Sequence, residues 1–441
     1  MRQYDTVVIG GGILGCFVAR NLRRWNLSVL LLEKEDDVCK GITRANSSIV
    51  YPGYDNKPGS LKAELTVRGN ANMGHLCEEL DVPFSRCGSL LVTYDVHSVS
   101  RLEKKLKNGI QNGVPDMRLL PGEEAEAMEP MLKPGVAAAL YAPSTGTVNP
   151  WQLGIAAFEN AVNNGAEVFL STQVLGIREN GQGFVVETSA ESYRCKMVFN
   201  CAGLSANKVQ ALAFPSPVRL ELDGAEYLVL DKNAPKPSRV VFHQAQSCGK
   251  GITAIPCTEG NLLISGIRKP LGIPFGTTAE GLQELHAAAK ELLPGVALDK
   301  VIRSFGAVRP NPYTESGESV HDFCIENPAP GFYSLIGIKT PGLTCANELG
   351  LYLAEKAAAF LQAEKNEEFD PKRKGISEND NEIICQCEQI TRAEIIEAIR
   401  RGAATVDGVK RRVGSGMGRC QGSRCTLKIQ KLLEEYHDRS L

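Results

Sequence analysis

A glycine pattern near the N-terminus constrains the fold of this chain more than any other feature. An apolar run at residues 4–9 is followed by G-x-G-x-x-G, a helical pattern, a second apolar run at 28–32 and the acid Glu33. The three glycines are Gly10, Gly12 and Gly15. In such a unit the first glycine permits a tight turn, the second admits a pyrophosphate, and the third lets the helix pack on the strand. The sequence therefore predicts a parallel sheet that binds a dinucleotide, with Glu33 accepting hydrogen bonds from ribose hydroxyls.

A set of four cysteines near the C-terminus is the second informative feature. They follow the pattern C-x-C, a gap of 32 residues, and C-x4-C, and they are Cys385, Cys387, Cys420 and Cys425. Four converging thiolates select zinc or an iron–sulfur cluster rather than a hard cation. C-x-C is tighter than the usual zinc spacing, and glycines around the second pair leave N–H groups free to bond sulfur. Iron is therefore favoured, and a zinc-binding or regulatory docking tail stays the alternative.

Five basic residues stand close to these cysteines in the sequence. They are Lys410, Arg411, Arg412, Arg419 and Arg424. Because a [2Fe–2S] centre with four thiolates is an anion, we expect these side chains to surround the ligands and to favour the addition of an electron. Aromatic residues are not interleaved with them, so a nucleic-acid partner is not expected.

Length and composition exclude several classes of protein. With 441 residues, 23% of them charged, and a net charge of −2, the chain predicts a globular protein of two or three domains without an anionic partner surface. No apolar stretch reaches the roughly 20 residues of a transmembrane helix, and no signal peptide is visible. The remaining ten of the 14 cysteines are scattered, and we expect them to be packing residues in a reducing, cytoplasmic compartment.

The residues around the four cysteines are expected to form a small helical domain at 383–441, after a polar linker at 364–382. Local signals predict its elements. In order, they are a capping box at Thr391 and Glu394, a helix stop at Gly402, a turn at Asp407 and Gly408, and a helix over 427–436.

Later segments distinguish between the possible dinucleotides. A strand and turn at 165–174, a strand ending in small residues at 195–203, and a strand, loop and helix start at 332–344 each favour FAD. The last segment is expected to present backbone N–H groups to an isoalloxazine carbonyl.

Together these motifs resemble the D-amino-acid oxidase superfamily of flavoproteins. The segments that carry the resemblance are 10–15 with Glu33, 43–50, 200–203 and 341–344. Residues 46–48 and 57–63 are similar to the branch of glycerol-3-phosphate dehydrogenase and L-2-hydroxyglutarate oxidase. The resemblance covers roughly residues 1–360 and implies non-covalently bound FAD. The FAD contacts that it implies are Gly10, Gly12, Ile13, Leu14, Glu33, Ser47, Ser48, Val174, Gly203, Gly342, Leu343 and Thr344.

The expected fold class is α/β and α+β. It combines a Rossmann-like FAD-binding domain with an interleaved antiparallel-sheet substrate domain, and adds a small helical C-terminal [2Fe–2S] domain. The oxidoreductase part is expected at 1–363. Its substrate cap should occupy approximately 75–148 and 208–330, where alternating apolar residues predict antiparallel strands.

The resemblance also indicates residues of the substrate pocket. Arg309 matches a segment that carries an arginine for the substrate anion, and a guanidinium can bind a carboxylate or phosphate through two parallel hydrogen bonds. Lys339 matches a basic position of the glycerol-phosphate branch. Where that branch often has histidine, this chain has Tyr51, so the general base must be another group, with Tyr51 and His243 as the candidates.

The C-terminal segments resemble the [2Fe–2S] domain of bacterioferritin-associated ferredoxin, as appended to anaerobic glycerol-3-phosphate dehydrogenase subunits. The two resemblances imply an FAD-dependent dehydrogenase of a small anionic 2-hydroxy compound, glycerol 3-phosphate first. Its electrons would pass through the cluster to a partner subunit. The alternatives are a dehydrogenase of L-2-hydroxyglutarate or of an imino or opine-type acid, and a flavoenzyme with a structural zinc or regulatory docking tail.

Overall fold

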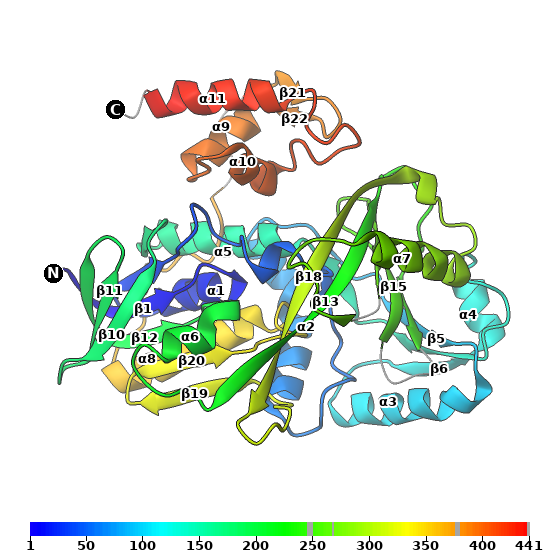
Figure 1. The fold of residues 1–441 in the computed structure, drawn as a ribbon, viewed down its shortest axis with the longest axis horizontal. Coiled ribbons are helices and arrows are strands. Elements are labelled where there is room, and N and C mark those ends of the chain that lie inside the picture. Colours follow the sequence, from blue (N-terminus) through cyan, green and yellow to red (C-terminus); the bar gives the residue numbers. More distant parts are fainter. Residues whose placement is uncertain (245–249, 267–268, 375–379, 439–441) are drawn as a thin grey trace.

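The computed structural model describes residues 1–244, 250–266, 269–374 and 380–438. Two large sheets lie side by side, and a small helical module packs on the side of the first of them (Figure 1). This architecture confirms the expected fold class. Cys248 and residues 375–379 of the expected linker lie outside the described residues.

The first sheet is built on β1 (Gln3–Ile9), which pairs in parallel with β2 (Val29–Leu32) and β12 (Ser192–Asn200). The other strands are β9 (Glu167–Phe169), β10 (Val174–Glu179), β11 (Phe184–Thr188), β19 (Cys324–Ala329) and β20 (Phe332–Ile336). All of β2 is buried, as a strand covered on both faces requires. Because β1 ends at the glycine turn, the turn lies at the carboxyl edge of the sheet, where open α/β sheets bind ligands.

Helices α1 (Ile13–Leu22), α5 (Pro150–Asn163) and α8 (Ala346–Leu361) cover one face of this sheet. Gly350 lets α8 approach α1, since a Cβ there would lie 2.6 Å from the carbonyl oxygen of Phe17. The remaining helices outside the module are α2 (Leu61–Glu79), α3 (Val99–Gln111), α4 (Gly122–Met128), α6 (Ala206–Gln210) and α7 (Ala279–Leu292). In the described part of the chain, no helix is both long enough and apolar enough to cross a bilayer.

The second sheet contains the long antiparallel pair β13 (Val218–Leu230) and β18 (Val301–Thr314). Its other strands are β5 (Ser89–Thr93), β6 (Arg118–Pro121), β7 (Ala138–Ala142), β14 (Val240–Gln244), β15 (Lys250–Pro256), β16 (Leu262–Ser265) and β17 (Lys269–Pro270). One pairing departs from the expected antiparallel sheet, because β14 runs parallel to β5. These strands come from chain segments far apart in sequence, so no hairpin fixes their relative direction.

A third, smaller sheet consists of β3 (Ile49–Val50), β4 (Phe84–Ser85) and β8 (Gly146–Val148), with β8 in the middle. It pairs the segment after residue 43 with the segment that precedes α5. The pairing holds β3 in place, and β3 leads directly to Tyr51.

The C-terminal module has its own apolar core. It consists of β21 (Ile383–Cys385), β22 (Ile390–Thr391), α9 (Arg392–Arg400), α10 (Val406–Val413) and α11 (Thr426–Asp438). Ile395, Val409 and Ile429 from the three helices are buried together. The capping box of Thr391 and Glu394 is present at the start of α9, as the sequence predicted.

The prediction of a turn at Asp407 and Gly408 is wrong, because both residues lie at the start of the helix α10. The N–H of Gly408 donates to the hydroxyl of Thr405 at 3.0 Å, which caps this helix. Gly408 allows α10 to lie close to Asp37 instead of forming a turn, since a Cβ at this position would lie 3.1 Å from a carboxylate oxygen of Asp37. The sequence alone did not reveal that α10 packs against a distant carboxylate.

A buried cluster of ion pairs fixes the module to the first sheet. Arg411 and Arg412 both donate to the carboxylate of Asp37, at 2.7 and 2.8 Å, and Arg412 also lies 3.5 Å from Glu159 of α5. The side chains of Asp37 and Arg412 are each 2% exposed. Arg411 and Arg412 are therefore not part of the positive collar predicted around the cysteines, because carboxylates of the nucleotide-binding part neutralise them.

The segment that leads to the module is hydrogen bonded along its path. The buried Arg20 of α1 donates to the carbonyl of Pro371 at 3.0 Å, and Arg373 pairs with Glu159 at 2.9 Å. Arg401 of α9 donates to the carbonyl of Lys374 at 2.6 Å. Up to residue 374, this polar segment is thus attached to the body of the protein on its inner side.

Candidate functional site

A cavity of about 620 Å³ opens at the carboxyl edge of the first sheet and reaches the second sheet. Its lining comes from the glycine turn after β1, the end of β2, residues 40–47 with Tyr51, strand β18, and the loop between β20 and α8. The fold thus brings segments from the beginning, middle and end of the first 345 residues to one space.

The glycine turn shows which positions exclude a side chain for packing reasons and which leave room for a ligand. Gly10 has a φ of 102°, and a Cβ at Gly15 would lie 1.9 Å from the carbonyl oxygen of Gly10. By contrast, a Cβ at Gly12 would meet only the hydroxyl of Thr43, at 3.7 Å. The space in front of Gly12 faces the N-terminus of α1, where N–H groups and the helix dipole favour an anion. This geometry fits a pyrophosphate.

The carboxylate of Glu33 lies beside the same turn. It accepts the N–H of Gly11 at 2.6 Å through one oxygen and the N–H of Glu35 at 2.9 Å through the other. Burial raises the pKa of Glu33, and the two N–H donors oppose that shift. Each oxygen keeps a second lone pair, so the group can still accept a hydrogen bond from a ribose hydroxyl.

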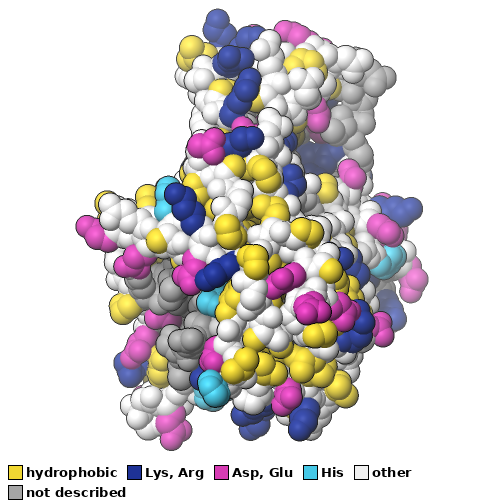
Figure 2. All heavy atoms as spheres, turned by 90° about the vertical axis from the view of Figure 1, so that its right-hand side faces the viewer, with side chains coloured by type: hydrophobic (Ala, Val, Ile, Leu, Met, Phe, Trp, Pro, Cys, Tyr) yellow, Lys and Arg dark blue, Asp and Glu magenta, His cyan; other side chains and the backbone are white. Residues whose placement is uncertain are grey.

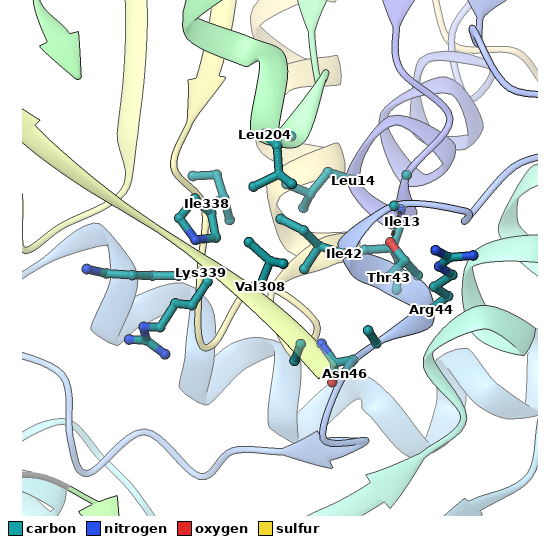
Figure 3. A pocket seen from close by; sticks show the side chains of 18 of the residues that line it. Ile13, Leu14, Ile42, Thr43, Arg44, Asn46, Leu204, Val308, Ile338 and Lys339 are labelled. Carbon is teal, nitrogen blue, oxygen red and sulfur yellow. Dashed lines mark hydrogen bonds between the residues drawn. The ribbon is translucent and has the colours of Figure 1, made fainter. Parts of the chain in front are cut away.

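The middle of the cavity has apolar walls (Figure 3). These walls come from several elements, and the apolar side chains are Leu14, Ile42, Leu204, Val308 and Ile338. Arg44 and Lys339 lie on opposite sides of this region in the view of Figure 3. A flat ring system shielded from water suits such walls, whereas the glycine turn and Glu33 suit phosphates and a ribose. The residues present therefore fit FAD.

Cationic side chains lie where the cavity meets the second sheet. Arg309 of β18 donates from Nη1 to the hydroxyl of Thr340 at 2.9 Å, and Lys339 donates from Nζ to Oδ1 of Asn311 at 3.0 Å. Tyr51 lines the same cavity. Two cations and a phenol in a partly enclosed space can bind a small anion that carries a hydroxyl group.

A third cation, which the sequence analysis did not single out, lies near Arg309. Lys62 is 8% exposed, its ammonium donates to the carbonyl of His321 at 3.1 Å, and it lies 5.4 Å from the ring centre of Phe323. Burial, and next the positive charge of Arg309, lower the pKa of Lys62. The available signal was its place in the motif at 57–63, but a lysine at the start of a helix ordinarily faces solvent.

The structure brings most of the expected site residues into one lining. Those that line the cavity are Gly10, Gly12, Ile13, Leu14, Glu33, Ser47, Tyr51, Val174, Gly203, Arg309, Lys339, Gly342 and Leu343. Two others stand behind it. Ser48 has a φ of 62° and its N–H donates to Asn46, while the hydroxyl of Thr344 accepts the N–H of Tyr51 at 2.9 Å. Both are placed to shape the backbone of lining residues.

Several lining residues were missed by the sequence analysis as individual candidates. They include Lys34, Lys40, Thr43, Arg44, Asn46, Thr172 and Phe275. Thr43, Arg44 and Asn46 were within reach of sequence reasoning, since they belong to the motif at 43–50. Phe275 was not, because it enters the lining from the segment between β17 and α7, where no local pattern predicts contact with a nucleotide.

His243, the other candidate base, does not line the cavity. The ring of its neighbour Phe242 lies 6.2 Å from the ring of the lining residue Tyr51. Because side chains alternate along a strand, His243 points to the opposite face, where its ring lies 5.9 Å from that of Tyr94. Burial lowers the pKa of His243. Of the two candidates, Tyr51 alone is placed to contact a ligand in this cavity.

The four cysteines of the module meet in two pairs. The sulfurs of Cys387 and Cys420 lie 3.4 Å apart, and Cys385 and Cys425 are in contact with each other. The N–H of Gly416 points to the sulfur of Cys385 at 3.5 Å. Four thiols arranged as two neighbouring pairs fit a cluster of two irons with four protein ligands.

The two thiol pairs differ in their surroundings. A hydrogen bond with Cys387, followed by the N–H groups of Gly422 and Arg424, lowers the pKa of Cys420 to about 7. Burial raises the pKa of Cys425 to about 11. The hydrogen bond with Cys387 and the backbone donors therefore stabilise the thiolate of Cys420, which is the form that ligates iron.

Alanine substitutions at Gly15 and Gly12 are expected to separate folding from FAD binding. G15A places a methyl group against a backbone oxygen and should lower the free energy of unfolding by about 1–3 kcal/mol or more. G12A should leave the FAD-free protein as stable as the wild type, because its methyl group has room, yet lower FAD affinity about tenfold or more by occupying the phosphate space. Thermal unfolding and fluorescence titration with FAD measure the two effects. Unchanged FAD affinity in G12A would contradict the assignment.

Known proteins match both parts of this chain. Residues 5–356 match the family described as FAD dependent oxidoreductase, and residues 383–435 match the BFD-like [2Fe-2S] binding domain. The second match contains the four cysteines, the helices α9 and α10, and most of α11.

Relatives and solved structures match most of the chain. The chain is 38% identical to the glycerol 3-phosphate dehydrogenase of Caloramator mitchellensis, over 98% of this chain and 94% of that protein. It is 27% identical to the L-2-hydroxyglutarate dehydrogenase of Indibacter alkaliphilus, over 80% of this chain and 99% of that protein. Among solved structures, dithionite-reduced L-α-glycerophosphate oxidase from Mycoplasma pneumoniae with FAD bound superposes with a TM-score of 0.77 at 24% identity, over 84% of this chain and 98% of that one. That last likeness concerns the fold.

Proposed function

Since the chain belongs to the FAD dependent oxidoreductase family, we propose that it is a dehydrogenase of glycerol 3-phosphate. The observation that carries this proposal is the pair of cations, Arg309 and Lys339, at the substrate side of the FAD cavity. The relative at 38% identity is named for the same substrate. When bound, FAD accepts the hydride of the substrate, and the [2Fe–2S] cluster carries electrons onward one at a time.

FAD and a [2Fe–2S] cluster are the cofactors of this chain. For FAD, we propose that the glycine turn binds the pyrophosphate and that Glu33 accepts hydrogen bonds from the ribose. The backbone at Gly342 and Leu343 is proposed to contact the isoalloxazine. Ser48 and Thr344 then act indirectly, by holding their neighbours. For the cluster, the ligands proposed are Cys385, Cys387, Cys420 and Cys425.

Oxidation of glycerol 3-phosphate removes a hydride from C2 and a proton from the C2 hydroxyl, which leaves dihydroxyacetone phosphate. Arg309 can bind the phosphate through two parallel N–H groups, and Lys339 adds a second positive charge. Tyr51 is the residue proposed to orient the C2 hydroxyl and to accept its hydrogen bond. These three side chains come from three separate elements, so their roles depend on the closed fold.

L-2-hydroxyglutarate is the second candidate substrate. Its dehydrogenase from Indibacter alkaliphilus is 27% identical to this chain. The compound carries two carboxylates that the same cations can bind. An imino or opine-type acid is an anion of the same class and belongs in the same substrate panel.

Anaerobic reduction by each candidate substrate tests the proposal. Glycerol 3-phosphate is expected to abolish the visible absorbance of the flavin and then to produce the electron paramagnetic resonance (EPR) signal of a reduced cluster. If L-2-hydroxyglutarate reduces the flavin and glycerol 3-phosphate does not, L-2-hydroxyglutarate is the substrate instead. If no anionic 2-hydroxy or amino compound reduces the flavin, the dehydrogenase proposal fails.

Replacement of Arg309 by leucine is expected to lower kcat/KM for glycerol 3-phosphate about a hundredfold or more, because loss of one partner of a buried charged pair costs about 2–5 kcal/mol. Arg309→Lys should restore part of this loss, since it keeps the charge but not the two parallel donors. Flavin reduction in stopped flow measures both.

The matched control for this prediction is Arg219→Leu. Arg219 is an exposed arginine on the neighbouring strand β13 and pairs with Glu221. The Arg219→Leu variant should leave the rate of flavin reduction unchanged. An equal loss in both variants would mean that the effect comes from the sheet and not from a contact with the substrate.

An electron-accepting partner subunit and a cytoplasmic location complete the proposal. Apart from the four proposed cluster ligands, the cysteines in the described part of the chain are free thiols. Free thiols in this number accord with a reducing compartment, where disulfides are rare. Anaerobic purification from the native source, with identification of the proteins that accompany the chain, tests both points.

A further inference from the structure

One pair of cluster ligands faces the surface of the module, and the other pair is buried. Cys385 and Cys425 are each 1% exposed, whereas Cys387 and Cys420 are partly exposed. We call Cys387 and Cys420 the outer pair. Exposed side chains lie close to this pair in sequence, in the loop between α10 and α11 and in the first turn of α11. Together with the outer pair, they form what we call the exit face: Cys387, Arg419, Cys420, Arg424, Leu427 and Lys428.

The exit face is positively charged. In the described part of the chain, Arg419, Arg424 and Lys428 have no carboxylate within ion-pair distance. Glu388, an acid next to Cys387, is paired with Lys232 at 2.5 Å. Figure 2, which views the molecule from the side where α11 begins, shows Lys and Arg side chains gathered on the module. The N-terminus of α11 adds the positive end of a helix dipole.

An apolar side chain lies within this charged surface. Leu427 is 76% exposed, the highest value among the large apolar side chains described. It stands two residues after the ligand Cys425. An exposed apolar residue with basic residues next to it in sequence, close in the chain to the ligand of a redox centre, is typical of the small docking surfaces of electron-transfer proteins, which combine brief contact with charge steering.

An anionic membrane is the other surface that basic residues can bind, and the rest of α11 argues against it. Membrane attachment generally needs about 4–8 basic residues in one cluster. Beyond Lys428 and Lys431, α11 continues with the exposed acids Glu434 and Glu435, which anionic lipids would repel. Along α11, the positive charge is thus concentrated toward the end that follows the ligand Cys425.

We propose that the exit face docks a one-electron carrier protein whose redox group is surrounded by acidic side chains. This inference rests on the proposed function, because it needs the cluster to receive electrons from a reduced substrate. Each substrate gives up two electrons and two protons. Two carrier molecules therefore take up one electron each, and the protons pass to water.

The test uses the full chain with both cofactors, and cytochrome b5, an acidic haem protein, as the probe. R419E/R424E reverses two charges of the exit face, and K428E reverses one charge further from the ligands. The matched control is K104E/K107E, two exposed lysines of α3. Calorimetric titration measures Kd, and the haem spectrum measures the rate of reduction at increasing salt concentration.

Binding of cytochrome b5 to the wild type is expected to weaken with salt. R419E/R424E should raise Kd at least tenfold, K428E severalfold, and K104E/K107E not at all. Iron content and the cluster EPR signal should be unchanged in all variants, which separates docking from assembly of the cluster. Cytochrome c, a basic haem protein, should bind more weakly than cytochrome b5.

Two results would overturn the inference. One is an equal Kd for R419E/R424E and K104E/K107E. The other is co-sedimentation of the wild type, but not of R419E/R424E, with vesicles that contain phosphatidylglycerol, which would identify a lipid occupant. Binding is measured without turnover, and for the rate assay the protein can be reduced with dithionite and freed of the excess before cytochrome b5 is added. A failure of glycerol 3-phosphate as substrate is therefore distinguishable from a failure of docking.

Discussion

The Asp37→Asn variant is expected to release the C-terminal module from the first sheet. The carboxylate of Asp37 is the shared partner of Arg411 and Arg412, and all three side chains are almost completely buried. Removal of one partner from a buried ion pair costs about 3–5 kcal/mol, because it leaves an uncompensated charge without water. The docked state should therefore lose about a hundredfold or more in population, and trypsin should cleave the segment at Lys372 and Lys374 faster.

Release of the module should also affect the path between the cofactors. Arg411 donates to the carbonyl of Val38, and the N–H of Cys39 donates to the carbonyl of Gly11 at 2.8 Å in the glycine turn. One continuous chain of contacts thus joins α10 to the FAD site. In Asp37→Asn, substrate should still reduce the flavin, whereas the cluster EPR signal should appear much more slowly.

Asp407→Asn is the matched control for this variant. Asp407 pairs with the same Arg411, but its side chain is 58% exposed, so the pair contributes at most about 1 kcal/mol. Proteolysis and electron transfer should remain close to those of the wild type. Similar behaviour of the two variants would show that the buried cluster does not position the module.

The Cys425→Ser variant is expected to lose the cluster and to keep the flavin chemistry. A serine hydroxyl is a harder and less acidic ligand than a thiol, so it does not replace a buried thiolate on iron. Purified protein should contain little iron or acid-labile sulfide and lack the cluster EPR signal. Glycerol 3-phosphate should still reduce FAD at the wild-type rate, while reduction of an acceptor that draws electrons from the cluster should fall below detection.

Cys87→Ser provides the comparison for Cys425→Ser, because Cys87 is a half-buried thiol between β4 and β5, outside the C-terminal module. It should keep the wild-type iron content and acceptor reduction. Zinc instead of iron in anaerobically prepared wild type, or normal acceptor reduction by Cys425→Ser, would contradict the relay.

Local sequence patterns determined the parts of the site whose partners are close in the chain. Gly15 and Glu33 were predictable because their nearest partners, Gly10 and Gly11, belong to the same strand–helix–strand unit. The capping box at Thr391 and Glu394 was predictable for the same reason. Tyr51, Arg309 and Lys339 were predicted only through resemblance, since no local pattern brings three separate segments to one cavity.

The sequence by itself determined the classes of cofactor, because glycine spacing and thiol spacing are chemical requirements of a dinucleotide and of a soft metal or metal cluster. Only the tertiary structure decided what the surrounding charges do. Arg411 and Arg412 have the same local context as a basic collar, yet they are buried against Asp37 and Glu159, more than 250 residues away. An ion pair depends on distance in space, and distance in space between remote segments is decided by the packing of the whole chain.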